Sequence, residues 1–185
     1  MVPRPITFVA KSEYFTSRKP IERMFGLYLR RANHLPVDRS GARAGQEMLE
    51  AALGVLRRGS LFGIYPEGTR SPDGRLYRGR TGVGWLALRS GAPVVPVAMI
   101  GTDLLLPPGH RLPRPRRIEI RVGRPLTFEE FREVPVGARQ RRAVTDRVVE
   151  AIRELSGQEY VEMYASARKE QLAAAAGGPD AGAGE

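Results

Sequence analysis

The chain has 185 residues, 42% of them hydrophobic, which is enough for one sizeable core but not for two. The net charge of +10 and the pI near 10.7 favour a polyanionic partner, whether nucleic acid, an anionic membrane surface or a phosphorylated ligand. Cysteine is absent, which excludes disulfides and thiolate metal sites, and no apolar run reaches the roughly 18 residues of a membrane-spanning helix.

The N-terminal part of the chain is predicted to contain short strands and two helices. Residues 7–10 form a short buried strand, and apolar residues recur at helical spacing over 20–29. The second pattern predicts a helix that faces the core with Met24 among its apolar residues. Residues 35–38 are short and extended, and a further helix is predicted over 44–58.

The central part alternates strands, a turn and a helix. Residues 61–65 and 94–100 are apolar runs of strand length, and residues 83–88 are predicted to be helical. Between them, Ser71-Pro72-Asp73-Gly74 is a strong turn sequence. Residues 118–122 alternate apolar and charged side chains, which predicts a half-exposed strand.

The C-terminal part is predicted to be helical up to about residue 172. One face of a last long helix carries apolar residues at helical spacing, namely Val144, Val148, Ile152 and Leu155. Residues 173–185 are rich in Ala and Gly without periodicity, and we expect a disordered tail. Strands alternating with helices predict an α/β fold, with a mostly parallel sheet flanked by helices, in one domain over residues 1–160.

The segment Tyr65-Pro66-Glu67-Gly68-Thr69-Arg70-Ser71 follows a predicted strand, where ligands bind in open α/β sheets. Arg70 can present two donors to a phosphate, and Thr69 and the Gly68 amide can add others. Glu67 can accept from a hydroxyl or hold the arginine. The alternative is a simple turn that caps the next helix.

This segment resembles the Phe-Pro-Glu-Gly-Thr-Arg-Ser signature of the glycerolipid acyltransferases. Three more segments resemble blocks of that family in the same order: Pro36-Val37-Asp38-Arg39-Ser40, Tyr77-Arg78-Gly79 and Val94-Val95-Pro96-Val97-Ala98. The four segments lie within residues 5–125. The resemblance implies a glycerol-3-phosphate acyltransferase-like sandwich.

The resemblance also implies roles for individual residues. Pro96 would belong to the acyl pocket. No metal and no cofactor is expected beyond acyl-CoA or acyl carrier protein as co-substrate. The glycerophospholipid acceptor would be bound by Arg39, Glu67, Gly68, Thr69, Arg70, Lys11 and Arg78.

The catalytic residues are unassigned. The reaction needs a general base for the acceptor hydroxyl, and in the family a histidine held by an aspartate supplies it. That block, Asn-His, four variable residues and Asp, is expected before the first strand, upstream of Met1, so the fold is expected to be incomplete at its N-terminus. His34 and Asp38 are separated by three residues, and Pro36 disfavours the helical turn that would join them. We therefore do not expect His34 to be the base.

Three functions remain open. The first is transfer of an acyl group from acyl-CoA or acyl carrier protein to 1-acylglycerol-3-phosphate in phospholipid biosynthesis. The second is binding of lipid or acyl-CoA by a catalytically impaired relative. Nucleic-acid binding, the third, rests on charge alone and lacks a recognition motif.

The location expected for the chain is cytoplasmic, because its N-terminus lacks the features of a secretory signal. We expect peripheral, electrostatic contact with the anionic inner face of the membrane, to which the basic loop 108–117 can contribute. The oligomeric state is left open.

Overall fold

The structure is a computed structural model that describes residues 5–11, 24, 27, 34–37, 44–102, 117–131 and 134–176. The sequence predictions for Arg39 and Asp38, for most of the basic loop 108–117 and for residues 177–185 lie outside these ranges. Within them, no helix combines the length and the apolar character needed to cross a bilayer.

Three strands from the first part of the chain form a parallel sheet. Its central strand is β1 (Ile6–Lys11), with β2 (His34–Val37) on one side and β3 (Leu61–Phe62) on the other. Because the three strands are parallel, their carboxyl ends lie at the same edge of the sheet, and the residues that follow them share that edge.

Two further strand pairs complete the described sheets. β4 (Leu76–Tyr77) pairs in parallel with β7 (Tyr160–Val161), so the chain after the first sheet is joined to a segment more than eighty residues later. β5 (Val97–Ile100) and β6 (Glu119–Val122) form an antiparallel pair. The α/β class is therefore confirmed, with several small sheets where one mostly parallel sheet was expected.

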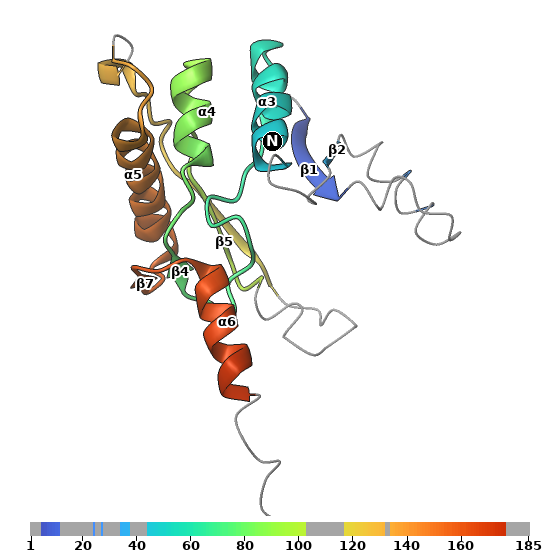
Figure 1. The fold of residues 1–185 in the computed structure, drawn as a ribbon, viewed down its shortest axis with the longest axis vertical. Helices are drawn as coiled ribbons and strands as arrows, with labels where there is room; N and C mark the ends of the chain where they lie inside the picture. The colour runs from blue at the N-terminus through green and yellow to red at the C-terminus, as the bar shows by residue number, and fades with distance from the viewer. Residues whose placement is uncertain are drawn as a thin grey trace, which may run out of the picture.

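Helices α3, α4 and α5 stand side by side (Figure 1). Both α4 and α5 end at a glycine in the left-handed conformation, Gly91 at φ 65° and Gly157 at φ 68°, which side chains disfavour. The helices are α3 (Ala44–Arg57), α4 (Gly82–Ser90), α5 (Ala138–Ser156), α6 (Ala165–Ala176) and the 3-10 helix η1 (Glu129–Phe131).

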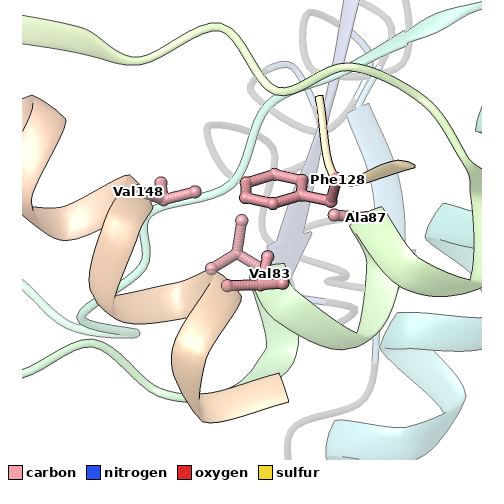
Figure 2. Close-up of a cluster of buried hydrophobic side chains, with 5 residues drawn as sticks. Val83, Ala87, Phe128 and Val148 are labelled. Carbon is pink, nitrogen blue, oxygen red and sulfur yellow. The ribbon is translucent and has the colours of Figure 1, made fainter. Parts of the chain in front are cut away.

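The core is built between α4 and α5. Figure 2 shows side chains of the two helices gathered around the ring of Phe128. The helices approach closely at Gly84, where an added Cβ would lie 2.2 Å from the carbonyl oxygen of Arg141. Burying each valine or phenylalanine side chain of this cluster stabilises the fold by about 1.5–3 kcal/mol. The buried members of the cluster are Val83, Ala87, Phe128, Val144 and Val148.

The helix predictions over 44–58 and 83–88 and the long helix with Val144 are confirmed by α3, α4 and α5. Two other predictions are wrong. Met24, from the helix predicted over 20–29, is helical but 70% exposed, so it does not face the core. Apart from residues 24 and 27, that predicted helix lies outside the described residues. Residues 173–176 were expected in the disordered tail, but they form the last turn of α6, because alanine favours the helix even without an apolar stripe.

The strand predictions over 7–10 and 35–38 are confirmed by β1 and β2. Those over 61–65 and 94–100 were too long, and β4 and β7 were missed. β3 ends at Phe62, although the Gly63 amide still donates to the carbonyl of Thr7. β5 begins only after Pro96, which has no amide hydrogen to offer a ladder, and Val94 makes an isolated bridge instead. The apolar face of β6 was expected to be half buried, yet Ile120 is 63% exposed.

Candidate functional site

The signature loop, residues 66–75, leaves β3 and returns to β4 through a tight turn. The Gly68 amide donates to the carbonyl of Tyr65 at 3.0 Å, and Gly68 has φ +73°, a conformation that favours glycine. The backbone N–H of Arg80 donates to the carbonyl of Pro66 at 2.7 Å and closes the base of the loop. The Gly68 amide is thus engaged within the turn and is not a free donor for a ligand.

Glu67 is oriented by the strand that follows the loop. Its Oε2 accepts a hydrogen bond from the backbone N–H of Tyr77 at 2.9 Å, whereas Oε1 has no hydrogen bond to any described residue. Burial raises the pKa of Glu67, and the Tyr77 amide and the Lys169 charge act in the opposite direction. Glu67 makes no ion pair with Arg70, so Oε1 stays available to accept from a ligand hydroxyl.

The next two signature residues carry the polar groups that reach the surface. Thr69 Oγ1 accepts a hydrogen bond from the ammonium of Lys169 at 2.6 Å. Arg70 is exposed, and no hydrogen bond or ion pair joins it to another residue in the described ranges. A free guanidinium beside a threonine hydroxyl is an arrangement that can bind a phosphate.

Arg78 points instead toward the C-terminal part of the chain. Its Nη1 lies 3.4 Å from Glu162 Oε1, and its guanidinium lies 5.7 Å from the centre of the Tyr164 ring. The charge of Arg78 therefore already has a carboxylate and an aromatic partner. Its predicted role in acceptor binding stays a prediction.

The parallel sheet places one further predicted residue at the edge where its strands end. Lys11 is the last residue of β1 and pairs in register with Val37, the last residue of β2. The chain leaves β3 at the same edge of the sheet, so Lys11 lies on the side where the signature loop begins. The predicted role of Arg39, which lies outside the described residues, stays a prediction.

His34 is the first residue of β2, at the opposite end of that strand from the shared edge. Its ring stacks on Phe8 with the ring centres 5.8 Å apart, and Phe8 stacks in turn on Tyr65 at 6.3 Å. Two aromatic rings therefore separate His34 from the signature loop.

Pro96, the residue predicted for the acyl pocket, is buried. Its carbonyl accepts from the Gly123 amide at 2.9 Å, and an added Cβ at Gly123 would lie 2.8 Å from Pro96 Cγ. The neighbouring Val95 and Val97 are exposed. Contact of Pro96 with an acyl chain stays a prediction.

A charged cluster at the far end of the loop was not predicted from the sequence. Asp73 accepts hydrogen bonds from Arg75 at 2.7 Å and from the hydroxyl of the fully buried Tyr77 at 2.8 Å. The hydrogen bonds from Arg75 lower the pKa of Asp73 to about 2. Arg168 of α6 adds a second cation, with its Nε 3.8 Å from the carboxylate.

A second feature that was not predicted from the sequence is the support of the loop by the C-terminal segment, residues 159–169. The backbone N–H of Leu76 donates to Glu159 and that of Arg78 donates to Met163, each at 3.0 Å, so the segment lies along the end of the signature loop. Two-residue strands have no periodicity to detect. The one available sequence signal is that Lys169 is one of three lysines in a chain whose other cations are arginines.

Comparison with known proteins gives the same assignment as the motifs. The acyltransferase family profile matches residues 1–100. The 1-acyl-sn-glycerol-3-phosphate acyltransferase of Bacillus subtilis (strain 168) is 30% identical over 156 residues, which cover 84% of this chain and 71% of that protein. The enzyme of the same name from Cocos nucifera is 31% identical over 134 residues, which cover 72% of this chain.

A solved structure agrees with the fold. The 1-acyl-sn-glycerophosphate (LPA) acyltransferase PlsC from Thermotoga maritima has a TM-score of 0.58 and 28% sequence identity, covering 80% of this chain and 56% of that one. The fold and the signature loop thus define an α/β transferase domain, and the chain belongs to the acyltransferase family. It spans 42% of the length of the Cocos nucifera protein and 36% of the Limnanthes alba relative.

Proposed function

We propose that the chain transfers an acyl group from acyl-CoA or acyl carrier protein to 1-acylglycerol-3-phosphate, which forms phosphatidic acid. The observation that carries the proposal is the signature loop, in which Arg70 has no partner among the described residues, Thr69 is held by Lys169 and Glu67 is fixed on the Tyr77 amide. The names of the Bacillus subtilis and Cocos nucifera relatives support the same acceptor.

The polar groups of the loop match the two ends of the acceptor's glycerol phosphate. Arg70 can donate two parallel hydrogen bonds to the phosphate, and Glu67 Oε1 can accept one from the free glycerol hydroxyl. In the transfer, the hydroxyl oxygen attacks the thioester carbonyl, the carbon–sulfur bond breaks and the thiol leaves. The thioester supplies the activated acyl group, so we propose no resident metal or organic cofactor.

The hydroxyl proton needs a base, and the described residues offer no histidine at the loop. His34 lies behind two aromatic rings, and His110 is outside the described residues. A second candidate function is therefore binding of the acceptor with little turnover. Loss of general-base catalysis typically lowers a rate by about 10²–10⁴.

The experiment compares binding and turnover in the same preparation. The chain should bind lysophosphatidic acid, and Arg70→Ala should weaken that binding by about 2–4 kcal/mol because a charge-assisted phosphate contact is lost. Release of thiol from acyl-CoA separates the two candidate functions: turnover at an enzyme's rate supports acyl transfer, and a rate near background supports binding alone. Arg139→Ala removes an exposed cation from α5 and is the control. Equal binding by Arg70→Ala and the unchanged chain would remove Arg70 from the site, and normal turnover abolished by His34→Ala would make His34 the base.

We also propose peripheral contact with an anionic membrane, on its cytoplasmic face. The net charge of +10 supports attraction to acidic headgroups, and the exposed apolar face of β5 and β6, which includes Met99, Ile120 and Val122, supports contact with lipid. Vesicles rich in phosphatidylglycerol should bind the chain, and salt should release it. Salt-insensitive binding to neutral vesicles would contradict the proposal.

A further inference from the structure

Helix α6 brings one cation onto the signature loop from outside the region that the family profile matches. The profile covers residues 1–100, and α6 spans Ala165–Ala176. In Figure 1 this helix stands apart from α3, α4 and α5. Lys169 donates from α6 to Thr69 Oγ1 across 100 positions of sequence.

The contact with Lys169 limits the hydrogen bonds that the Thr69 hydroxyl can still make. A hydroxyl has one donor hydrogen and two acceptor lone pairs. With one lone pair occupied by the ammonium at 2.6 Å, the hydroxyl hydrogen must point elsewhere, and the side chain of Thr69 makes no second hydrogen bond to a described residue. The positive charge also polarises the O–H bond, which makes Thr69 a stronger donor to an anion.

The same ammonium acts on the neighbouring signature residue. Its charge opposes the burial that raises the pKa of Glu67, so it helps to keep that carboxylate ionised. Two cations therefore bracket the loop tip: Lys169, which is fixed on Thr69, and Arg70, which has no described partner.

The other contacts of α6 with this region do not involve the signature residues at positions 67–70. Arg168 faces the carboxylate of Asp73, and Ser166 accepts a hydrogen bond from Arg80 at 3.1 Å. These contacts already hold the helix without touching the residues at positions 67–70. Lys169, by contrast, donates to Thr69, a signature residue whose hydroxyl hydrogen has no acceptor among the described residues.

We propose that Lys169 is a positioning residue of the acceptor site, which turns the Thr69 hydroxyl toward the acceptor's phosphate. The inference rests on the proposed function, since it takes the ligand of the loop to be a phosphate monoester. It predicts that Lys169 and Thr69 act as one unit and that their contribution depends on the phosphate of the ligand.

The test measures dissociation constants of the full chain by calorimetry for two probes. One is 1-hexanoylglycerol 3-phosphate, and the other is 1-hexanoylglycerol, which lacks the phosphate. Lys169→Met and Thr69→Val should each weaken binding of the first probe about tenfold, as the loss of a hydrogen bond to a charged group does. Binding of the second probe should not change, and the double variant should be no weaker than the weaker single variant.

Three further variants separate positioning from a structural tie or a general charge effect. Lys169→Arg should recover most of the binding, because it restores the cation. Ser166→Ala loosens α6 without touching Thr69, and Arg139→Met removes a cation elsewhere, so both should bind like the unchanged chain. Thermal unfolding of each variant checks that it is folded.

The outcomes distinguish the two proposals. If Lys169→Met binds the phosphate probe normally while Arg70→Ala does not, the role of Lys169 is refuted and the acceptor site stands. Equal weakening by Lys169→Met and Ser166→Ala, on both probes, would make Lys169 a structural tie and also refute the inference. If the unchanged chain fails to prefer the phosphate probe, the proposed function itself is wrong.

Discussion

The signature loop and the β5–β6 pair are two surface regions of one domain that are held in opposite ways. The loop is fixed by polar contacts with distant residues: Gln158 Nε2 donates to the Gly74 carbonyl at 2.6 Å, and Lys169 donates to Thr69. The β5–β6 pair is held by its own ladder and by α5 on one face only, where Arg121 donates to the Leu155 carbonyl at 2.9 Å.

The difference shows how each region meets a ligand. Polar side chains need fixed partners to present donors in one direction, and the C-terminal segment supplies those partners to the loop. A flat apolar face needs no such orientation, because hydrophobic contact has no directional requirement. We therefore expect substitutions in the loop to affect stability and binding strongly, and substitutions on the exposed face of β5 and β6 to leave the fold intact.

The largest effect on stability is expected from Gly79→Ala, which disturbs the packing of the loop's end on α5. The added Cβ would lie 2.8 Å from Val149 Cγ2 and 2.9 Å from Thr145 Cγ2, and both are short, branched side chains that cannot turn away easily. The free energy of unfolding should fall by about 2 kcal/mol in a urea titration. Gly45→Ala, where no atom lies within 4 Å, is the control and should be neutral or slightly stabilising. A neutral Gly79→Ala would contradict the close packing.

Asp73→Asn is expected to have the next largest effect on the free energy of unfolding, about 1 kcal/mol after allowing for solvent screening. Folding lowers the pKa of Asp73 from 3.8 to about 2, so the carboxylate stabilises the fold above pH 3.8 and loses this contribution as the pH falls toward 2. Asp73→Asn should lower the melting temperature at pH 7, and the difference should vanish near pH 2. Glu154→Gln, on the exposed side of α5, is the control and should leave the melting temperature at pH 7 unchanged. A constant difference across this range would exclude the ionic contribution.

Glu67→Gln should have a smaller effect of the opposite sign, less than about 1 kcal/mol. Burial raises the pKa of Glu67, so its contribution to stability is present below its ordinary pKa of 4.5 and is lost as the pH rises through the folded value. Glutamine keeps an oxygen for the Tyr77 amide without the buried charge. The variant should melt slightly higher at pH 7 and equally below pH 4, while binding the acceptor less well. A lower melting temperature at pH 7 would mean that the charge is stabilising.

The smallest effect is expected on the open side of the β5–β6 pair. Ile120→Thr and Val122→Thr change side chains that are 63% and 64% exposed and keep β-branching, so each should alter stability by no more than about 0.5 kcal/mol. Val148→Thr makes the same kind of change in the core and should cost about 1–3 kcal/mol. If the open face contacts lipid, the double variant should bind anionic vesicles less well while melting normally. A large loss of stability would show that the face is covered in solution.

The predictions from sequence succeeded where structure is set by neighbours along the chain. The apolar spacing in α3, α4 and α5 repeats over several turns, and the left-handed glycines Gly91 and Gly157 end two of these helices. The signature loop was located because Glu67 and Arg70 lie in a recognisable order. The turn had been considered as the alternative, but the Gly68 amide was predicted to be free for a ligand, and it donates to the Tyr65 carbonyl instead.

What the sequence determined by itself was the α/β class, the family and the signature loop, because helical periodicity and the order of the motifs are local properties of the chain. Only the tertiary structure decided which residues support that loop. The pairing of β4 with β7 and the hydrogen bond from Lys169 to Thr69 join positions 84 and 100 residues apart. Two-residue strands and a single lysine have no periodic pattern, and their partners are set by how α5 folds back against the core.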